Sequence, residues 1–238
     1  MCLVVVGHKV HDGHRLVVAG NRDEFHARPT EEARWWADDP DIAGGRDLLA
    51  GGTWLAVHRN GRFATVTNYR GTTMEIREPR SRGHLVTGFL QGDLSPMDYL
   101  RSLHGDRYAG FNLLVSDGNT LAYCSNQGDA PRELPPGVYG LANTHLDAKG
   151  ERIGRSKERL TRLLAGNQIA DDALMGLLGD RNSASDDPFD APFVISPEFG
   201  TRCSTIVTMQ RTGSWQLLER RFNSAGQQTG ESLVAEDA

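Results

Sequence analysis

A cysteine in second position and a charged segment about twenty residues later are the features of this chain most able to do chemistry. The sequence begins MCLVVVG, and GNRDEF spans Gly20 to Phe25. Initiator methionine is usually removed when the next residue is small, and Cys2 then carries a free α-amine with a pKa of about 7.7 to 8.0. One residue would hold both a thiol nucleophile and a base, which is a known catalytic arrangement.

Packing is the simpler interpretation of Cys2 taken alone. Cysteine is among the most buried residue types, and here it precedes an apolar run that is typical of a buried strand. A hairpin over residues 2–10 and 14–24 would, however, bring Arg22 or Asp23 back beside Cys2. Arginine there would favour the thiolate, and a carboxylate would hold the α-ammonium or accept its proton. A solvated turn with a weak Arg/Asp surface pair explains the segment equally well.

Strand signals dominate the first part of the chain, where two hairpins are expected. Asp12-Gly13 joins the runs 2–10 and 14–24, and Asn60-Gly61 turns a second hairpin over 53–69. Residues 32–52 are rich in Gly, Asp and Pro and predict a loop, with Trp35 and Trp36 covering the sheet. Further strands are predicted over 111–126, 137–143, 202–210 and 214–223.

Helical spacing occupies two blocks between the strands. Residues 83–103 predict two helices, the second with Ser95 as N-cap and Pro96 in its first turn. Residues 152–166 and 170–180 also predict helices, each ended by a glycine. Strands at both ends with helices between them indicate an α+β fold, in which antiparallel sheet carries helices on its faces. Sandwiched sheets would bring the first and last strands together.

Composition limits the classes of protein that the chain can represent. With 238 residues, a net charge of -5 and three cysteines, it has the profile of one ordinary globular domain over 1–238, with less order expected after about residue 224. The acidic balance argues against nucleic acid as a partner. We find no membrane-length apolar stretch, signal peptide or disulfide framework, and therefore expect a cytoplasmic protein.

Histidines around the first hairpin raise the question of a metal or haem site. His8, His11, His14 and His26 are the candidates. His11 and His14 flank the predicted turn and are expected to point into solvent, and no carboxylate or cysteine completes a site at metal spacing. No metal site is therefore predicted.

Several short motifs together resemble a known family. From Met1 to about Thr208 the chain contains, in order, MCLVVV, GNRDEF followed by RPT, GGTWLAV, TNYR, GFNLLV, YGLANTHLD and GTRCSTIV. This ordered set resembles the transport and Golgi organisation 2 family, also called the NRDE-motif family. That family is similar in turn to the cysteine branch of the N-terminal nucleophile hydrolases, which includes penicillin V acylase and bile salt hydrolase.

The resemblance implies a fold and a set of site residues. The fold would be a four-layer αββα sandwich, with a Cys nucleophile exposed once methionine is removed. The implied catalytic positions are Cys2, Arg22, Asp23, Asn68 in VTNYR, Asn143 in GLANTH and Arg202 in GTRCST. Arg22 and Asp23 are adjacent here, whereas the hydrolase pair is spaced apart, and adjacent strand residues point to opposite faces.

The resemblance also implies two alternative functions. One is hydrolysis of a non-peptide amide or related acyl bond of a small molecule, with no cofactor required. Asn143 and Asn68 would then donate to the oxyanion, while Arg22 and Arg202 keep the sulfur anionic. The asparagines would otherwise only serve turns. The alternative function is non-enzymatic binding and trafficking of haem, lipid or acyl-CoA, for which haem would be cargo.

Overall fold

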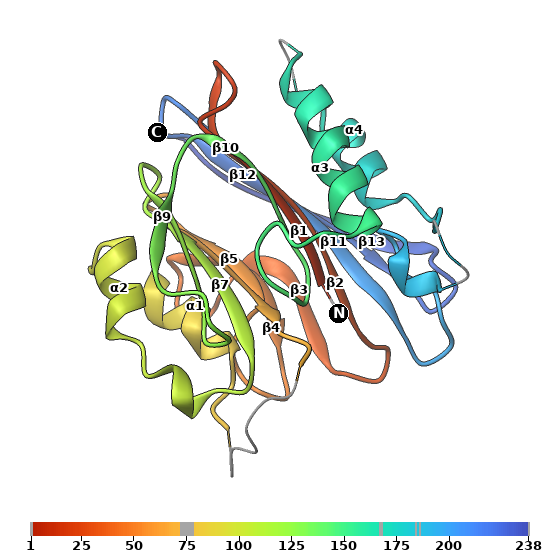
Figure 1. The fold of residues 1–238 in the computed structure, drawn as a ribbon, viewed down its shortest axis with the longest axis horizontal. Coiled ribbons are helices and arrows are strands. Elements are labelled where there is room, and N and C mark those ends of the chain that lie inside the picture. The colour runs from red at the N-terminus through yellow and green to blue at the C-terminus, as the bar shows by residue number, and fades with distance from the viewer. Residues whose placement is uncertain (1, 72–78, 167–168, 184, 186, 238) are drawn as a thin grey trace. The chain divides into compact units, whose positions relative to one another are not determined.

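The strands pair into two antiparallel sheets, and each sheet belongs to its own compact unit. The computed structural model describes residues 2–71, 79–166, 169–183, 185 and 187–237. The first unit comprises Met1–Arg28, Pro136–Ala142 and Leu146–Ala238, and the second Pro29–Pro135 and Asn143–His145. Figure 1 colours the chain along its sequence. That residues 1–238 form one domain stays a prediction.

The first unit is built on a six-stranded sheet in the order β10-β1-β2-β11-β12-β13. Its strands are β1 (Cys2–His8), β2 (His14–Phe25), β10 (Gly137–Leu141), β11 (Phe199–Gln210), β12 (Trp215–Phe222) and β13 (Gln228–Glu236). β1 and β2 form the predicted hairpin, and β2 pairs on its other side with β11. The expectation that strands from the two ends of the sequence come together is confirmed.

Two helices cover one face of this sheet. α3 (Glu151–Leu164) and α4 (Asp171–Leu178) confirm the predicted helical segments and lie side by side over the strands in Figure 1. Leu3 and Val5 of β1 share a hydrophobic core with Leu160 and Leu174 of these helices. The alternate strand residues Val4 and Val6 are buried as well. Because residues on both faces of β1 are buried, the sequence of this strand is a continuous apolar run rather than an alternation of apolar and polar residues.

The second unit holds a seven-stranded sheet in chain order, from β3 to β9. Its strands are β3 (Thr30–Trp35), β4 (Ile42–Asp47), β5 (Leu55–His58), β6 (Phe63–Asn68), β7 (Phe111–Ser116), β8 (Leu121–Ser125) and β9 (Arg132–Leu134). The predicted Asn60-Gly61 turn is present, with Gly61 at φ 83°. α1 (Gly83–Leu90) and α2 (Pro96–Ser102) pack on this sheet through Phe89 and Leu100.

One predicted helix cap is present in the structure. The Ser95 side chain accepts a hydrogen bond from the Asp98 backbone N–H at 3.2 Å, as predicted for an N-cap. Two 3-10 turns, Gly105–Arg107 and Pro188–Asp190, were not predicted. Within the described ranges, the helices are all too short or too polar to cross a membrane.

The prediction of a loop over 32–52 is wrong, because this segment contributes β3 and β4. Its glycines resemble a turn in sequence but serve strand packing. A Cβ added to Gly44 would lie 2.7 Å from the carbonyl oxygen of Leu55 on the neighbouring strand, so only glycine fits there. Trp36 is buried against this sheet, as expected, and donates to the Gly44 carbonyl at 2.9 Å.

Order continues past residue 224, where the sequence predicts less of it. Residues 228–236 pair with β12 as the edge strand β13. Only Val234 is buried in it, so the strand lacks the alternating apolar pattern that would reveal it. Its polar side chains are used instead, since Glu231 forms an ion pair with Arg220 at 2.6 Å.

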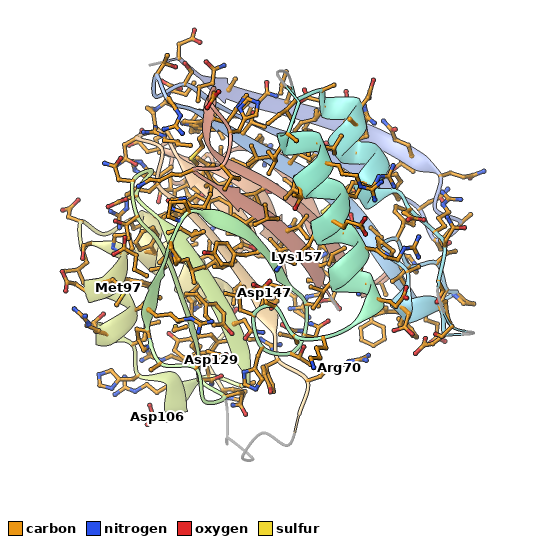
Figure 2. The ribbon with its side chains drawn as sticks, turned by 45° about the horizontal axis from the view of Figure 1, so that its top comes forward. Arg70, Met97, Asp106, Asp129, Asp147 and Lys157 are labelled. Carbon is orange, nitrogen blue, oxygen red and sulfur yellow. The ribbon has the colours of Figure 1, made fainter. Side chains whose placement is uncertain are left out.

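A polar contact fixes the start of α3 against β10. Asp147 adopts φ 58° and accepts a hydrogen bond from the Gly140 backbone N–H at 2.8 Å. Lys157 of α3 reaches the same carboxylate oxygen at 2.6 Å, and Figure 2 shows the two side chains together. The left-handed backbone at Asp147 thus lets one carboxylate join the strand to the helix.

His8, at the end of β1, is a buried ionisable group in this sheet. It is 2% exposed, and its Nδ1 has no hydrogen-bond partner within the described part of the chain. Burial, assisted by the charge of Lys9, lowers the pKa of His8 to about 4. The folded state therefore holds His8 neutral at pH values where an unfolded chain would protonate it.

Acidification should consequently destabilise the protein through His8. Because the folded pKa is the lower one, the contribution is complete above pH 6.5 and is lost as the pH falls toward 4. A tenfold change in proton affinity corresponds to about 1.4 kcal/mol, so the loss is at most about 3 kcal/mol. Urea unfolding of wild type and His8→Leu from pH 7.5 to pH 4 measures it. Wild type should lose more stability than His8→Leu over this range, and equal losses in the two proteins would contradict the assignment.

Candidate active site

Cys2, Arg22 and Cys203 form a row across three neighbouring strands of the first unit. Cys2 is paired with Arg22 in the β1–β2 register, and Arg22 is paired with Cys203 in the β2–β11 register. Directly paired residues of antiparallel strands point to the same face. Cys2 is half-buried, whereas Arg22 and Cys203 are almost completely buried. The hairpin therefore brings Arg22, rather than a solvated turn, beside the candidate nucleophile.

The Cys2 thiol experiences opposing influences. Burial raises the pKa of Cys2 above its ordinary value, and the charge of Asp23 adds to the rise. The positively charged amino terminus, the Arg22 guanidinium and a hydrogen bond from the Asp23 backbone N–H all lower the pKa of this thiol. Burial is the largest of these effects, so Arg22 moderates the rise without reversing it. Met1, whose removal is expected, lies outside the described residues.

Arg202 adds positive charge at the end of the same strands. It occupies the irregularity in the β2–β11 register between Thr201 and Cys203. Its Nη1 donates to the carbonyls of Phe25 at 2.9 Å and Arg28 at 3.1 Å. Burial and then the nearby charge of Arg22 lower the pKa of Arg202. The bulge thus directs Arg202 to the turn that follows β2.

The Asp23 carboxylate points away from Cys2, to the helix-covered face. Arg152 of α3 donates to its Oδ2 at 2.6 Å, and the Thr201 hydroxyl donates to its Oδ1 at 2.7 Å. Asp23, Arg152 and Thr201 are all buried. The period-two expectation that Arg22 and Asp23 occupy opposite faces therefore holds in the structure. The backbone N–H of Asp23 reaches the sulfur of Cys2, while the Asp23 carboxylate is directed to Arg152 and Thr201.

Sequence reasoning missed the polar network around Asp23. Asn21 lies on the same face, where its Nδ2 donates to the carbonyls of Leu178 at 2.9 Å and Pro192 at 2.8 Å. Ser204 donates to the Asn21 side-chain oxygen at 2.6 Å. A signal for Arg152 was present, because it occupies the buried stripe of α3 with Ile153, Ser156, Leu160 and Leu164. An arginine in such a stripe requires a buried partner.

Asn68 and Asn143 come together in the second unit. The Asn143 side-chain Nδ2 donates to the backbone carbonyl of Asn68 at 2.8 Å, and the Arg70 backbone N–H donates to the Asn143 carbonyl at 2.6 Å. Asn143 is buried, while Asn68, at the end of β6, is exposed. An asparagine amide carries two N–H donors, of which Asn143 gives one to Asn68. The two predicted oxyanion donors thus share one junction of the chain.

The expectation that His11 and His14 point into solvent is wrong for His11, which is 8% exposed. His11 Nδ1 accepts from the Gly13 backbone N–H at 3.0 Å and lies 3.1 Å from His14 Nδ1. Its Nε2 lies 3.1 Å from the Gly166 carbonyl oxygen. His26 contacts the Ser196 carbonyl in the same way. Among the described residues, no group of three metal-ligating side chains is assembled.

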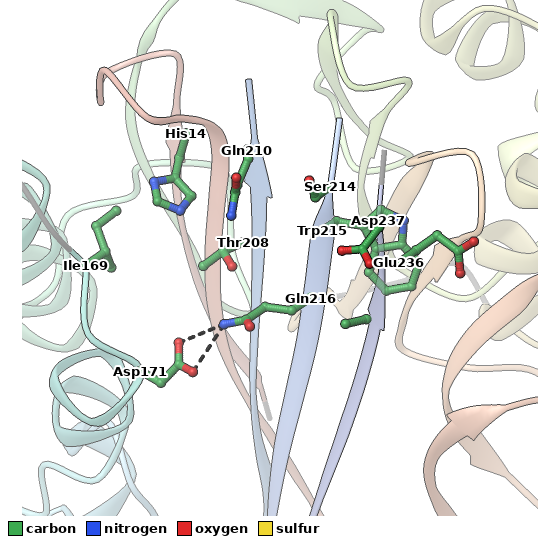
Figure 3. A pocket seen from close by; sticks show the side chains of 11 residues that line it. His14, Ile169, Asp171, Thr208, Gln210, Ser214, Trp215, Gln216, Glu236 and Asp237 are labelled. Atoms are coloured by element: carbon green, nitrogen blue, oxygen red, sulfur yellow. Dashed lines mark hydrogen bonds between the residues drawn. The ribbon is translucent and has the colours of Figure 1, made fainter. Parts of the chain in front are cut away.

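A polar cavity of about 370 Å³ opens on the six-stranded sheet of the first unit, at the end of β2 opposite to Arg22 (Figure 3). Its lining includes His14, Thr208 and Trp215, and Gln216 donates to both carboxylate oxygens of Asp171 at 2.9 and 3.1 Å. β2 runs from His14, at the cavity, to Arg22, which is about 26 Å along an extended strand. The cavity is therefore separate from the Cys2 site.

Solved structures with this fold include hydrolases. A C2A mutant of conjugated bile acid hydrolase from Clostridium perfringens matches with a TM-score of 0.60 at 9% identity, covering 98% of this chain and 92% of that one. A Caenorhabditis elegans ortholog of N-acylethanolamine-hydrolyzing acid amidase matches with a TM-score of 0.56 at 10% identity, covering 86% and 92%. The predicted α+β fold of the N-terminal nucleophile hydrolase type is thereby confirmed.

Sequence comparison finds relatives across most of the chain. A Transport and Golgi organization protein 2 homolog from Bos taurus is 32% identical over 241 residues, which cover 88% of this chain and 87% of the relative. The Homo sapiens homolog is 31% identical over the same shares. The family model Transport and Golgi organisation 2 matches residues 1–224. The chain belongs to the Transport and Golgi organisation 2 family.

Proposed function

We propose that this protein is an N-terminal cysteine hydrolase that cleaves a non-peptide amide or related acyl bond of a small molecule. The observation that carries the proposal is the pairing of Cys2 with the buried Arg22. Two solved proteins of this fold bear the names of an amidase and a bile acid hydrolase. The hydrolase was solved as a mutant of a cysteine in second position, where this chain also has cysteine.

The reaction would use both functional groups of the terminal residue. The thiolate of Cys2 attacks the acyl carbon, the bond to the leaving amine breaks, and the α-amine passes a proton to that amine. Water then attacks the resulting thioester, releasing the carboxylic acid and the free sulfur. Every atom of the products comes from substrate and water, so no cofactor enters the balance.

The remaining predicted residues would stabilise charge. The guanidiniums of Arg22 and Arg202 would favour the anionic sulfur. By the family resemblance, Asn143 and Asn68 would donate to the oxyanion, and a donor of this kind is worth about 3 kcal/mol in a comparable site. Asp23 would contribute through the backbone N–H that already reaches the Cys2 sulfur, while its carboxylate anchors the strand to Arg152.

Alkylation tests whether Cys2 is the reactive thiol. Burial raises the pKa of Cys124 to about 12 and also raises that of Cys203. Once Met1 is removed, the ammonium lies on Cys2 itself and should favour its thiolate. Protein made in cells should therefore lack Met1 by intact mass, and iodoacetamide should modify Cys2 at least about tenfold faster than the other cysteines.

The matched control is protein that retains Met1, prepared with methionine aminopeptidase inhibited. Its Cys2 should be alkylated more slowly and only at higher pH. Full-length mass in untreated cells, together with a Cys2 no more reactive than Cys124, would reject the nucleophile assignment.

Turnover tests the hydrolase proposal directly. Acyl p-nitroanilides and acyl thioesters of short and long chains would be screened with wild type, Cys2→Ala and Cys124→Ala. We expect wild type and Cys124→Ala to hydrolyse the same substrates, because Cys124 lies in the core of the second unit. Cys2→Ala should show no turnover, since it lacks the nucleophile. Equal rates in all three proteins would contradict the proposal.

The same three proteins separate the hydrolase from a carrier. Non-enzymatic carriage of haem or acyl-CoA predicts ligand binding without turnover. A haem Soret shift abolished by one histidine or cysteine substitution, in a protein that hydrolyses nothing, would favour the carrier. Haem uptake unchanged by all such substitutions would indicate nonspecific association.

A further inference from the structure

The second unit contains a hydrogen-bonded chain of Tyr69, His145 and Asp129. The Tyr69 hydroxyl lies 2.8 Å from His145 Nε2, and His145 Nδ1 lies 2.7 Å from Asp129 Oδ2. Tyr69 directly follows β6, His145 lies in the short segment 143–145, and Asp129 follows β8, so three separate segments meet here. Figure 2 labels Asp129 among the strands of this unit.

The contacts determine the direction of each hydrogen bond. An ionised carboxylate only accepts, so His145 Nδ1 carries the hydrogen that bonds to Asp129. In the neutral ring, Nε2 then has a lone pair, and Tyr69 must donate its hydroxyl hydrogen to it. A hydroxyl, an imidazole and a carboxylate in this order are the arrangement in which a general base activates a hydroxyl.

Asp129 is held in place by buried neighbours. The hydroxyl of the fully buried Tyr123 lies 2.9 Å from both Asp129 Oδ2 and Asn112 Oδ1. Burial alone would raise the pKa of Asp129, but hydrogen bonds from His145 and Tyr123 and the charges of His145 and Arg132 outweigh it and lower that pKa. The carboxylate is thus ionised and fixed toward the imidazole.

The reactive end of the chain remains accessible. The His145 side chain is 47% exposed, and Tyr69 is half-buried. Tyr69 and His145 flank the junction of Asn68 and Asn143, in which Asn143 donates to the Asn68 carbonyl at 2.8 Å. The chain of Tyr69, His145 and Asp129, called the relay below, therefore lies beside the two asparagines that the proposed function assigns as hydrogen-bond donors to the substrate carbonyl.

We propose that Tyr69 is a catalytic acid–base residue for the acyl substrate, with His145 and Asp129 as the positioning residues that activate its hydroxyl. The inference rests on the proposed function for the identity of the substrate, an acyl compound whose carbonyl is bound by Asn68 and Asn143. The activation of Tyr69 itself rests only on the contacts within the second unit.

The step assigned to the relay is the attack of water on the acyl carbon. Water gives a proton to the Tyr69 oxygen, while the Tyr69 proton passes to His145 Nε2. The C–O bond forms as the bond from the acyl carbon to its leaving group breaks, and that electron pair goes to the leaving group. The imidazolium, stabilised by Asp129, then returns its proton through the Tyr69 oxygen to solvent.

A chemical probe tests the activation of Tyr69 without a known substrate. Benzenesulfonyl fluoride is attacked at sulfur by a phenol oxygen, fluoride leaves, and the phenol proton would pass to His145. Peptide mass spectrometry should show Tyr69 modified much faster than Tyr139, a half-buried tyrosine in β10 that serves as internal control. His145→Gln and Asp129→Asn should slow labelling of Tyr69 by about 100-fold, the lower range for a positioned base.

The two variants should leave the labelling of Tyr139 unchanged and retain the wild-type circular dichroism spectrum. Labelling of Tyr69 at the rate of Tyr139, or unaffected by His145→Gln, would overturn the proposal. If one variant loses the folded spectrum, the labelling rates of Tyr69 and Tyr139 in wild type decide the question instead.

Turnover by Tyr69→Phe then separates this inference from the proposed function. With a thioester or amide that wild type hydrolyses, Tyr69→Phe should lower kcat by about 100-fold. Unchanged kcat in Tyr69→Phe, with turnover still lost in Cys2→Ala, would reject the relay and leave the hydrolase in place. Turnover by Cys2→Ala would instead reject the proposed function.

Discussion

The register of β2 against β1 and β11 is the constraint on which the Cys2 site depends. It pairs Arg22 with Cys2 on one side and with Cys203 on the other. Because side chains alternate along a strand, a slip of one residue would replace Arg22 by a neighbour that now faces the helices. The same slip would move every apolar residue of the strand to the opposite face of the sheet. The buried valines of β1 and β2 therefore help to fix the position of the charged Arg22 beside Cys2.

The Asp23–Arg152 ion pair holds this register from the opposite face. Removing one partner of a buried pair leaves an uncompensated charge, which typically costs about 3–5 kcal/mol. Asp23 also binds Thr201, the last residue before the irregularity that displaces Arg202. One carboxylate thus connects α3, β2 and β11, while its backbone N–H reaches the sulfur of Cys2. Asp23 therefore contributes to both faces of the sheet, through its side chain on the helix-covered face and through its backbone N–H at Cys2.

Sequence reasoning succeeded where the signal is local. Turn residues and apolar runs predicted the hairpins, and helical spacing predicted all four α-helices of the described ranges. It failed at β4, whose Gly44 permits close strand packing although glycine also signals a turn, and at β13, whose exposed edge position requires no apolar alternation. For the site, hairpin geometry predicted that Arg22 or Asp23 lies beside Cys2, and the observed register places Arg22 there. Sequence reasoning missed Arg152, whose place in the apolar stripe of α3 was a usable signal, and it could not find Asp129 or His145, because their partners lie far away in sequence. Burial of His11 escaped it for the same reason, since the Gly166 carbonyl that His11 contacts is 155 positions further along the chain.

The motifs TNYR and ANTH each combine an asparagine with a residue of different chemistry, and the structure explains why both are needed at one place. Asn143 donates to the Asn68 carbonyl, and the Arg70 backbone N–H donates to Asn143, so two backbone segments are joined at a fixed offset. That offset brings Tyr69 within hydrogen-bond distance of His145. An amide cannot act as a base near neutral pH, and an imidazole is a poorer fixed donor than an amide held by the backbone. Placing both kinds of group on the same two segments puts the hydrogen-bonded Tyr69 and His145 beside the asparagines, whose own contacts fix the geometry of the junction.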